Sequence, residues 1–375
     1  MQLSFGRSSL VAVACALLLG GAHTTAQSTT SRKPASSAAS TSAKATKAPQ
    51  TSTAKATQTS QAKPPQTRTS LAKARQAAAE RARRAAAARA RERERIEIDA
   101  MTPRYKRDLL GNQIPEVRAA AAIVFDPQTN AVLWEQNSHD QRSIASLTKL
   151  MTAVTFVADE PDLEQVIAVT YADTRAASVT HLRTGDRVSY RDLLHLVLIA
   201  SDNAAARVLA RTSEGGTAAF VGRMNEMAVN LGLTSTSYSD PSGLDARNVS
   251  SAYDISHIIT YAGADPLLGP IMRTQEYEAH TKTRAIAIHS TNKLLGTGMD
   301  VLGGKTGFIS KAGYCLATLL RVPQGPQVAV VVLGAANSTT RFWEARHLFN
   351  WVVGRWAGLA GGDAVPEAPG AELIQ

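Results

Sequence analysis

Ser146 and Lys149 are the two residues whose types and spacing best suit covalent catalysis. They form a Ser-Leu-Thr-Lys motif, and on a helix side chains three residues apart share one face, so the amine can reach the hydroxyl. A serine hydroxyl is a poor nucleophile until a base removes its proton. A lysine can be that base only when burial or nearby positive charge lowers its pKa. The apolar residues at positions 144, 145, 150 and 151 suit such a site.

The same S-x-x-K spacing occurs elsewhere in the chain, so the motif alone is not specific. The other instances are Ser52–Lys55, Ser60–Lys63, Ser70–Lys73 and Ser290–Lys293. Three of them lie in a low-complexity N-terminal extension. A motif without structural context is only a hypothesis, and further residues are needed to support it.

Ser201-Asp202-Asn203 follows the apolar stretch Leu193–Ala200 and is a second candidate element. Ser201 could relay a proton between the lysine and a leaving amine. The Asn203 amide could donate to a substrate, and its carbonyl could accept from the lysine. The competing interpretation is a helix interruption capped by serine or aspartate.

Lys305-Thr306-Gly307 leads into an apolar strand and is the third. On an edge strand facing a cleft, Lys305 would supply a fixed positive charge and Thr306 a hydroxyl for a substrate carboxylate. Gly307 would leave room for the backbone to approach a bound peptide. The competing interpretation is a glycine-rich turn entering a strand.

Strands at both ends of the folded region and helices between them must position these residues. Apolar runs flanking turn residues predict two hairpins, at Ala119–Trp134 and Tyr314–Gly334. Helical stretches are predicted at Leu147–Ala158, Tyr190–Ala210 and Ala218–Leu231, and a further helix follows the second hairpin. We therefore predict an α+β fold: one antiparallel sheet with a helical subdomain inserted between its strands.

The three motifs in this order match the set of penicillin-binding proteins and class A β-lactamases. From Ala119 to Trp356 the sequence resembles the S11-type D-alanyl-D-alanine peptidases, the low-molecular-mass penicillin-binding proteins, which implies a β-lactamase/transpeptidase-like fold. The stretches Thr291–Leu295 and Phe308–Leu316 are more similar to the penicillin-binding protein 7 endopeptidase type than to the carboxypeptidase type.

The resemblance implies an acyl-enzyme mechanism on peptidoglycan stem peptides and cross-links, with β-lactams as covalent inhibitors and no metal or organic cofactor. Lys149 would take the proton of Ser146, which attacks a D-Ala carbonyl, and Ser201 would protonate the leaving amine. The oxyanion would lie between the backbone N–H groups of Ser146 and Phe308. The residues expected to hold the substrate are Asn203, Lys305, Thr306 and Gly307.

Charge and composition divide the chain into segments. The formal net charge of the chain is +10. Residues 27–99 contain 16 Lys/Arg and 5 Asp/Glu, whereas residues 100–375 contain 24 Lys/Arg and 26 Asp/Glu, so the positive charge lies in the N-terminal extension. We expect a signal peptide at 1–26, a disordered linker at 27–70, a basic, partly helical spacer at 71–115, the catalytic domain at 116–358 and a flexible tail at 359–375. The protein would then be exported to the periplasm or envelope. Its extension could contact anionic envelope polymers, and no nucleic-acid partner is expected.

Several alternatives remain open at this stage. A DD-carboxypeptidase would use the same motifs. A class A β-lactamase needs a glutamate to activate the deacylating water, and Tyr238–Leu244 contains none, which predicts slow release of penicillins. A metallopeptidase is disfavoured because the eight histidines lack ligand spacing. The non-enzyme alternative is a wall-binding module in which the basic extension is the active part. Cys315 is predicted to be an inert buried thiol.

Overall fold

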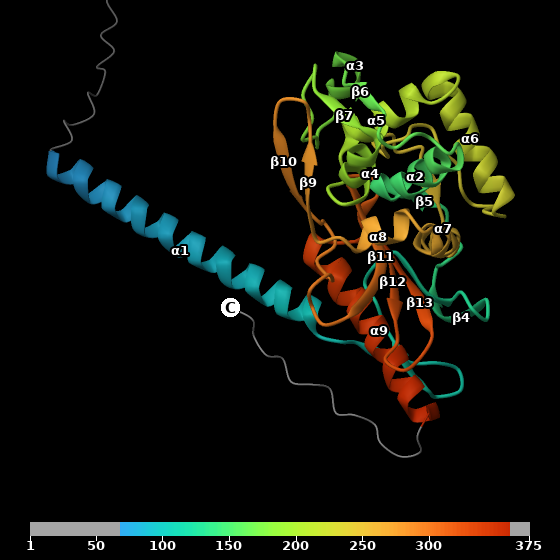
Figure 1. Ribbon diagram of the computed structural model, residues 1–375. Helices are drawn as coiled ribbons and strands as arrows, with labels where there is room; N and C mark the ends of the chain where they lie inside the picture. The colour runs from blue at the N-terminus through green and yellow to red at the C-terminus, as the bar shows by residue number, and fades with distance from the viewer. Residues whose placement is uncertain (1–67, 361–375) are drawn as a thin grey trace, which may run out of the picture. The chain divides into compact units, whose positions relative to one another are not determined.

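The computed structural model describes residues 68–360, and a five-stranded sheet is the centre of this part of the chain (Figure 1). The strand order is β11-β12-β13-β3-β4, and every pairing is antiparallel. The strands are β3 (Ala121–Asp126), β4 (Ala131–Gln136), β11 (Asp300–Ile309), β12 (Gly313–Arg321) and β13 (Gln327–Ala335). Both predicted hairpins are confirmed, and β11, which carries the Lys-Thr-Gly motif, is an edge strand.

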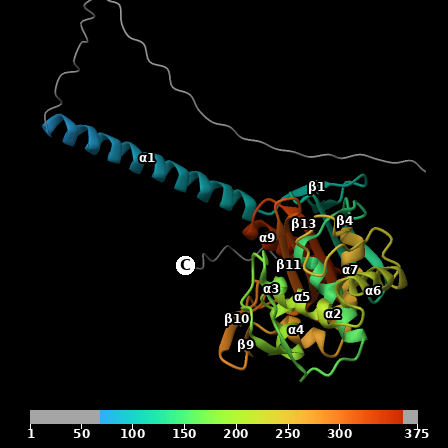
Figure 2. The same cartoon turned by 90° about the horizontal axis from the view of Figure 1, so that it is seen from above.

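Helices fill the sequence between β4 and β11, so the predicted α+β architecture with an inserted helical subdomain is confirmed. These elements are the 3₁₀ turn η1 (Ala145–Leu147), α2 (Thr148–Ala158), α3 (Tyr171–Thr174), α4 (Tyr190–Leu198), α5 (Asn203–Thr212), α6 (Gly216–Asn230), α7 (Ala252–Ala264) and α8 (Leu268–Arg273). In Figure 2, α7 lies on one side of β11 and β13, and α9 (Ser338–Ala360) lies on the other. Both faces of the sheet are therefore covered.

The apolar pattern of the central strands follows from this double coverage. All six residues of β3 are buried, as are most residues of β12 and β13. A strand buried on both faces has a continuous apolar run instead of an alternating one. Cys315 in β12 is fully buried, as predicted, and burial raises the pKa of its thiol to about 11.

The single helix predicted at Tyr190–Ala210 is wrong, because the structure divides it into α4 and α5. Ser201 has a φ of 60°, in the left-handed region, and cannot continue a right-handed helix. Asp202 then caps α5 by accepting a hydrogen bond from the backbone N–H of Ala205 at 2.9 Å. The capping interpretation of the Ser-Asp-Asn segment is therefore correct.

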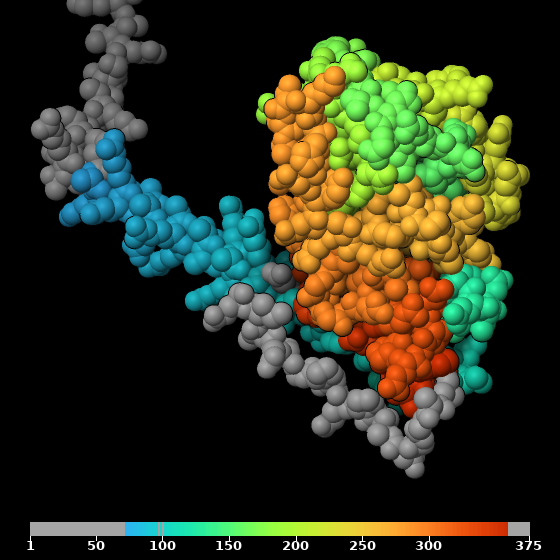
Figure 3. Space-filling view, viewed as in Figure 1, coloured from blue at the N-terminus to red at the C-terminus, as the bar shows by residue number. Residues whose placement is uncertain are grey.

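Several elements were not predicted. They are α7, α8, the hairpin β9 (Glu276–His280) with β10 (Ala285–His289), the hairpin β1 (Tyr105–Arg107) with β2 (Gln113–Pro115), and the short pairs β5 (Arg142–Ser143) with β8 (Val249–Ser250) and β6 (Val166–Ala168) with β7 (Arg187–Ser189). The β9–β10 hairpin, orange in Figure 3, lies against the green helical subdomain. Tyr277 attaches it there by donating to Asp192 at 2.8 Å and stacking on His195.

The basic segment forms one long helix, α1 (Arg68–Met101), whose side chains are exposed from residue 72 to 96. At its end Asp99 forms ion pairs with Arg104 and Arg118.

The closing helix α9 ends at Ala360, slightly past the expected domain end at 358. None of the helices in residues 68–360 has an apolar stretch long enough to cross a membrane. The predicted signal peptide, almost all of the linker and nearly all of the tail lie outside the described residues.

Candidate active site

Ser146 lies in the tight turn η1 directly before α2, and the backbone of this turn is constrained from two sides. Ala145 has a φ of 48°, which is unfavourable for a residue with a Cβ, and the Thr148 hydroxyl donates to the Ala145 carbonyl at 2.8 Å. Gly243, with a φ of 81°, lies so close that a Cβ there would be 2.0 Å from the Ala145 oxygen. Only glycine fits this position, and the close approach fixes the turn that carries the serine.

Lys149 lies one turn along from Ser146, and its amine is completely buried. Its Nζ is 2.9 Å from Ser146 Oγ, 2.6 Å from Asn203 Oδ1 and 2.5 Å from the Ser242 carbonyl oxygen. Burial lowers the pKa of Lys149 from its ordinary value to about 7, although Asp202 and Asp240 act in the opposite direction. The predicted proximity of serine and lysine, and the predicted lowering of the pKa, are both present in the structure.

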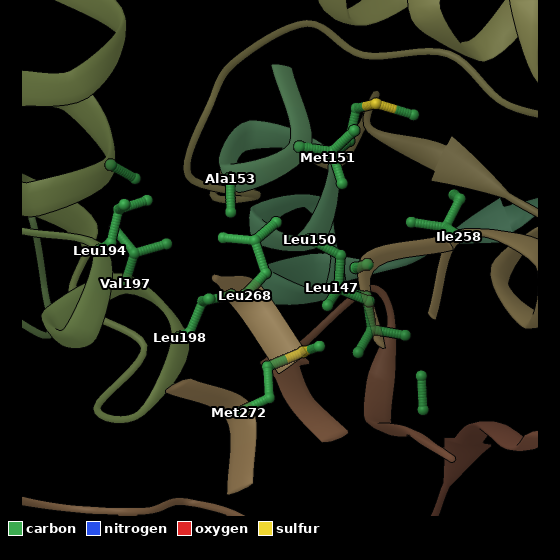
Figure 4. Close-up of a cluster of buried hydrophobic side chains, with 14 of the residues drawn as sticks. Leu147, Leu150, Met151, Ala153, Leu194, Val197, Leu198, Ile258, Leu268 and Met272 are labelled. Atoms are coloured by element: carbon green, nitrogen blue, oxygen red, sulfur yellow. The ribbon is translucent and has the colours of Figure 1, made fainter. Parts of the chain in front are cut away.

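Apolar side chains from four helices surround the start of α2 and account for this desolvation (Figure 4). The labelled side chains are Leu147, Leu150, Met151, Ala153, Leu194, Val197, Leu198, Ile258, Leu268 and Met272. Removing water from an amine disfavours its charged form. The helical subdomain therefore provides both the position of Lys149 and its lowered pKa.

A turn at residues 240–245 supplies the Ser242 carbonyl that Lys149 contacts. One Asp240 carboxylate oxygen accepts from the backbone N–H groups of Ser242 and Gly243, at 2.6 and 2.9 Å. The other accepts from the backbone N–H of Asp245 at 2.7 Å and from Asn248 at 2.8 Å. This network holds the turn rigid. In the sequence, this stretch was considered only for its lack of a glutamate, so the contact between Ser242 and Lys149 was missed.

Asn203 is buried at the start of α5, and both ends of its amide have protein partners. Its Oδ1 faces Lys149, as predicted, while its Nδ2 donates to the Ala177 carbonyl at 2.6 Å. Ala176 and Ser178, on either side of Ala177, both have left-handed φ values. The amide group that was expected to serve the substrate therefore also anchors the loop beside the site.

Lys305 is fully buried on β11, and its amine donates to Ser201 Oγ at 2.7 Å and to the Thr306 carbonyl at 2.9 Å. The predicted cation thus reaches the serine of the second motif. Burial, together with the positive charges of Lys149 and Arg341, holds the pKa of Lys305 well below its ordinary value. An anionic group beside the amine would stabilise its charged form, and the fixed charge expected for Lys305 stays a prediction.

The next two residues of the motif make contacts that the sequence does not reveal. The Thr306 hydroxyl donates to Thr291 Oγ1 at 2.7 Å, and this joins the motif to the Thr-Asn-Lys-Leu-Leu segment. A Cβ on Gly307 would be 2.9 Å from the Ile144 carbonyl and 3.1 Å from the Ser146 nitrogen. Gly307 therefore makes room for the turn bearing the nucleophile, and the room that it was expected to leave for a bound peptide stays a prediction.

Arg341 is a buried residue of α9 that sequence reasoning missed. Its guanidinium donates to the carbonyls of Gly307 at 3.1 Å and Cys315 at 3.2 Å, and it lies 5.5 Å from the Tyr314 ring centroid. It thereby ties the closing helix to the backbone of β11 and β12. No local pattern marks this arginine, since its partners lie 26 and 34 residues away.

Phe308 follows the motif, and its ring is 49% exposed and stacked on Tyr314, with ring centroids 4.2 Å apart. The close approach of Gly307 to the Ser146 nitrogen places the two backbone positions of the predicted oxyanion hole on adjoining elements. By contrast, Ser290–Lys293 has the same S-x-x-K spacing but forms no such pair. Ser290 Oγ accepts from the backbone N–H of Asn292 at 3.2 Å, and Lys293 is exposed.

This fold, with a serine beside a buried amine, defines the class of the protein as a serine hydrolase. The chain belongs to the D-alanyl-D-alanine carboxypeptidase family of S11 peptidases, whose family model matches residues 110–337. The family predicted from the three motifs is confirmed.

The individual relatives include proteins named as endopeptidases and proteins named as carboxypeptidases. The chain is 34% identical to a D-alanyl-D-alanine endopeptidase of Pseudomonas aeruginosa over 63% of its own length and 78% of the relative's. It is equally 34% identical to D-alanyl-D-alanine carboxypeptidase DacC of Escherichia coli, over 64% of its length and 62% of the relative's. Among solved structures, the Streptomyces K15 DD-transpeptidase superposes with a TM-score of 0.60 at 28% identity, covering 63% of this chain and 97% of the other. These likenesses confirm the β-lactamase-like fold.

Proposed function

We propose that this protein is a DD-endopeptidase that cuts peptide cross-links of peptidoglycan through an acyl-enzyme on Ser146. The observation that carries the proposal is the arrangement around the Lys149 amine. A neutral amine has two N–H bonds and one lone pair. The carbonyl oxygens of Asn203 and Ser242 are the two nearest acceptors, at 2.6 and 2.5 Å, so the lone pair is left for the Ser146 hydroxyl.

The reaction would proceed in two stages. Lys149 takes the Ser146 proton as Oγ attacks the D-Ala carbonyl, and the oxyanion is stabilised by the backbone N–H groups of Ser146 and Phe308. Ser201, hydrogen-bonded to Lys305, relays the proton that Lys149 took from Ser146 to the leaving amine, so that Lys149 is neutral again before the second stage. Water then hydrolyses the ester and regenerates the serine.

A bound substrate carboxylate would explain why a lysine amine, that of Lys305, is buried on β11. Lys305 is buried, no carboxylate within residues 68–360 forms an ion pair with it, and the nearby charges of Lys149 and Arg341 are positive. A bound peptide carboxylate would supply the missing negative charge and raise the pKa of Lys305 towards its ordinary value. The negative charge of the ligand and the positive charge of Lys305 would therefore stabilise each other in the complex.

The endopeptidase assignment is tested by digesting cross-linked muropeptides and separating the products by mass spectrometry. We expect the dimer peak to fall as two monomers appear, at a rate well above the release of terminal D-Ala from pentapeptides. Relatives with either name make the DD-carboxypeptidase the second candidate. Release of D-Ala with intact dimers would establish that activity and reject the endopeptidase.

We also propose that the protein is exported and that α1 attaches it to anionic envelope polymers. From Arg68 to Arg91 the sequence has eight Lys/Arg and one Glu, and the helix has no apolar face to insert into a membrane. Replacing Arg81, Arg83, Arg84, Arg89 and Arg91 by Gln should abolish retention on a phosphate-bearing polymer at low salt. Retention on an uncharged polymer is the control. Unchanged, salt-insensitive retention of the variant would reject this role for α1, because attraction between exposed charges is screened by salt.

A further inference from the structure

A pocket of about 170 Å³ lies between the segment after β10 and the first turns of α9, outside the residues assigned so far to catalysis. Its lining residues are Lys293, Leu294, Thr339, Phe342, Trp343 and Arg346. Leu294 and Phe342 are buried and form an apolar floor, whereas Lys293 is exposed and Arg346 is partly exposed at the rim. Pockets with an apolar base and a few polar groups are typical of ligand sites.

The rim of this pocket carries positive charge that the protein does not neutralise. Within residues 68–360, neither Lys293 nor Arg346 has a carboxylate at ion-pair distance, and the Arg346 guanidinium lies over the Trp343 ring at 5.1 Å. The acidic residue nearest in sequence, Glu344, is buried and accepts instead from the backbone N–H groups of Arg118 and Ala119. Two such cations beside an indole suit an anionic ligand with an apolar portion.

The two segments that line the pocket, residues 293–294 and α9, are both connected to β11, the strand that carries the Lys-Thr-Gly motif. On one side Thr291, two residues before Lys293, accepts from Thr306 of the Lys-Thr-Gly motif at 2.7 Å. Asn292 then fixes the turn by accepting from the Leu294 backbone N–H at 3.1 Å, and its amide packs so tightly on Gly304 that a Cβ there would be 2.3 Å away. On the other side, Arg341 of α9 holds the Gly307 carbonyl. The pocket is therefore a rigid continuation of the motif that would bind the substrate carboxylate.

We propose that this pocket binds the carboxylate-bearing leaving strand of a cross-linked peptide, the second stem that departs when the bond is cut. The inference rests on the proposed endopeptidase function, because a carboxypeptidase releases only a single D-Ala, which is too short to extend beyond the motif. Lys293 and Arg346 pair with carboxylates of that strand, and Trp343 packs on its aliphatic part. The pocket thus selects cross-linked over monomeric substrate.

The test uses the full chain with Lys293→Gln and Arg346→Gln together, changes that remove both positive charges and keep polar side chains. We expect kcat/KM for a cross-linked muropeptide dimer to fall at least tenfold, mainly through KM. Hydrolysis of a monomeric D-Ala-D-Ala peptide and acylation by benzylpenicillin should stay within twofold. With wild-type enzyme, a dimer that keeps the carboxylate assigned to Lys305 but has the other carboxylates of the leaving stem amidated should lose a similar factor.

A matched control is the variant Lys106→Gln with Arg355→Gln. It also removes one exposed lysine and one α9 arginine that lies over a tryptophan, here Trp351 at 5.0 Å, and it should behave as wild type on all substrates. Equal losses on dimer and monomer, or no loss on either, would overturn the inference while leaving the endopeptidase intact. Wild-type enzyme that acylates normally but leaves dimers uncut would overturn both the endopeptidase function and the pocket's role.

Discussion

Replacing Ser146 by alanine is expected to abolish covalent labelling by a fluorescent penicillin. Hydrolysis of D-Ala-D-Ala peptides should fall by about 10⁴-fold or more, which is the typical loss when a nucleophile that acts together with its base is removed. The Oγ atom 2.9 Å from Lys149 is the atom that would form the ester, and alanine leaves none. The measurement is gel fluorescence after brief exposure to the drug, with peptide turnover followed in parallel.

Ser70→Ala is the control, because Ser70 and Lys73 have the same S-x-x-K spacing in α1. It should label as wild type does. On the wild-type protein the label should also persist, since the 238–244 segment offers no glutamate to activate a deacylating water. Full labelling of Ser146→Ala would reject the assigned nucleophile, and rapid steady turnover of benzylpenicillin would instead indicate a β-lactamase.

Replacing Lys149 by arginine should slow acylation by about 10³-fold, although positive charge and hydrogen-bonding capacity are kept. A guanidinium stays protonated at every accessible pH and cannot accept the Ser146 proton. In the wild-type protein the amine has a pKa of about 7. Below that value the ammonium form dominates, so the acylation rate should rise about tenfold per pH unit as the pH increases to 7 and level off above it. Stopped-flow acylation between pH 5 and 9 gives this profile.

Asn203→Asp separates the role of the lysine charge from a purely structural role. Aspartate keeps an oxygen acceptor for Lys149 but adds a negative charge 2.6 Å from the amine position. An adjacent anion favours the ammonium, so the midpoint of the acylation profile should move to higher pH, and activity lost at pH 7 should return at alkaline pH. An unchanged midpoint would show that Lys149 is not the titrating base, whereas a loss that is the same at all pH values would reflect the donor to the Ala177 carbonyl that aspartate lacks.

How far the site could be predicted depends on the sequence separation of the contacting groups. The pairing of Ser146 with Lys149 follows from i, i+3 geometry on a helix, and the edge position of Lys305 follows from a glycine-rich entry into an apolar strand. The order of the three motifs also identified the family. Within each motif, the inference rests on residues that are adjacent or within one helical turn, and only the order of the motifs spans a long stretch of the sequence.

The tertiary structure alone decided which groups surround these residues. The acceptors that orient the Lys149 amine are 54 and 93 residues away, and Arg341 reaches Gly307 across 34 residues. The sequence offered two interpretations at Ser201, a continuous helix or a capped interruption, and the left-handed φ of Ser201 in the folded chain decided for the interruption. The same S-x-x-K spacing at Ser290 produces no reactive pair, since Lys293 is exposed. The chemical difference between the two lysines is burial, and burial is a property of packing between distant segments, which local spacing does not specify.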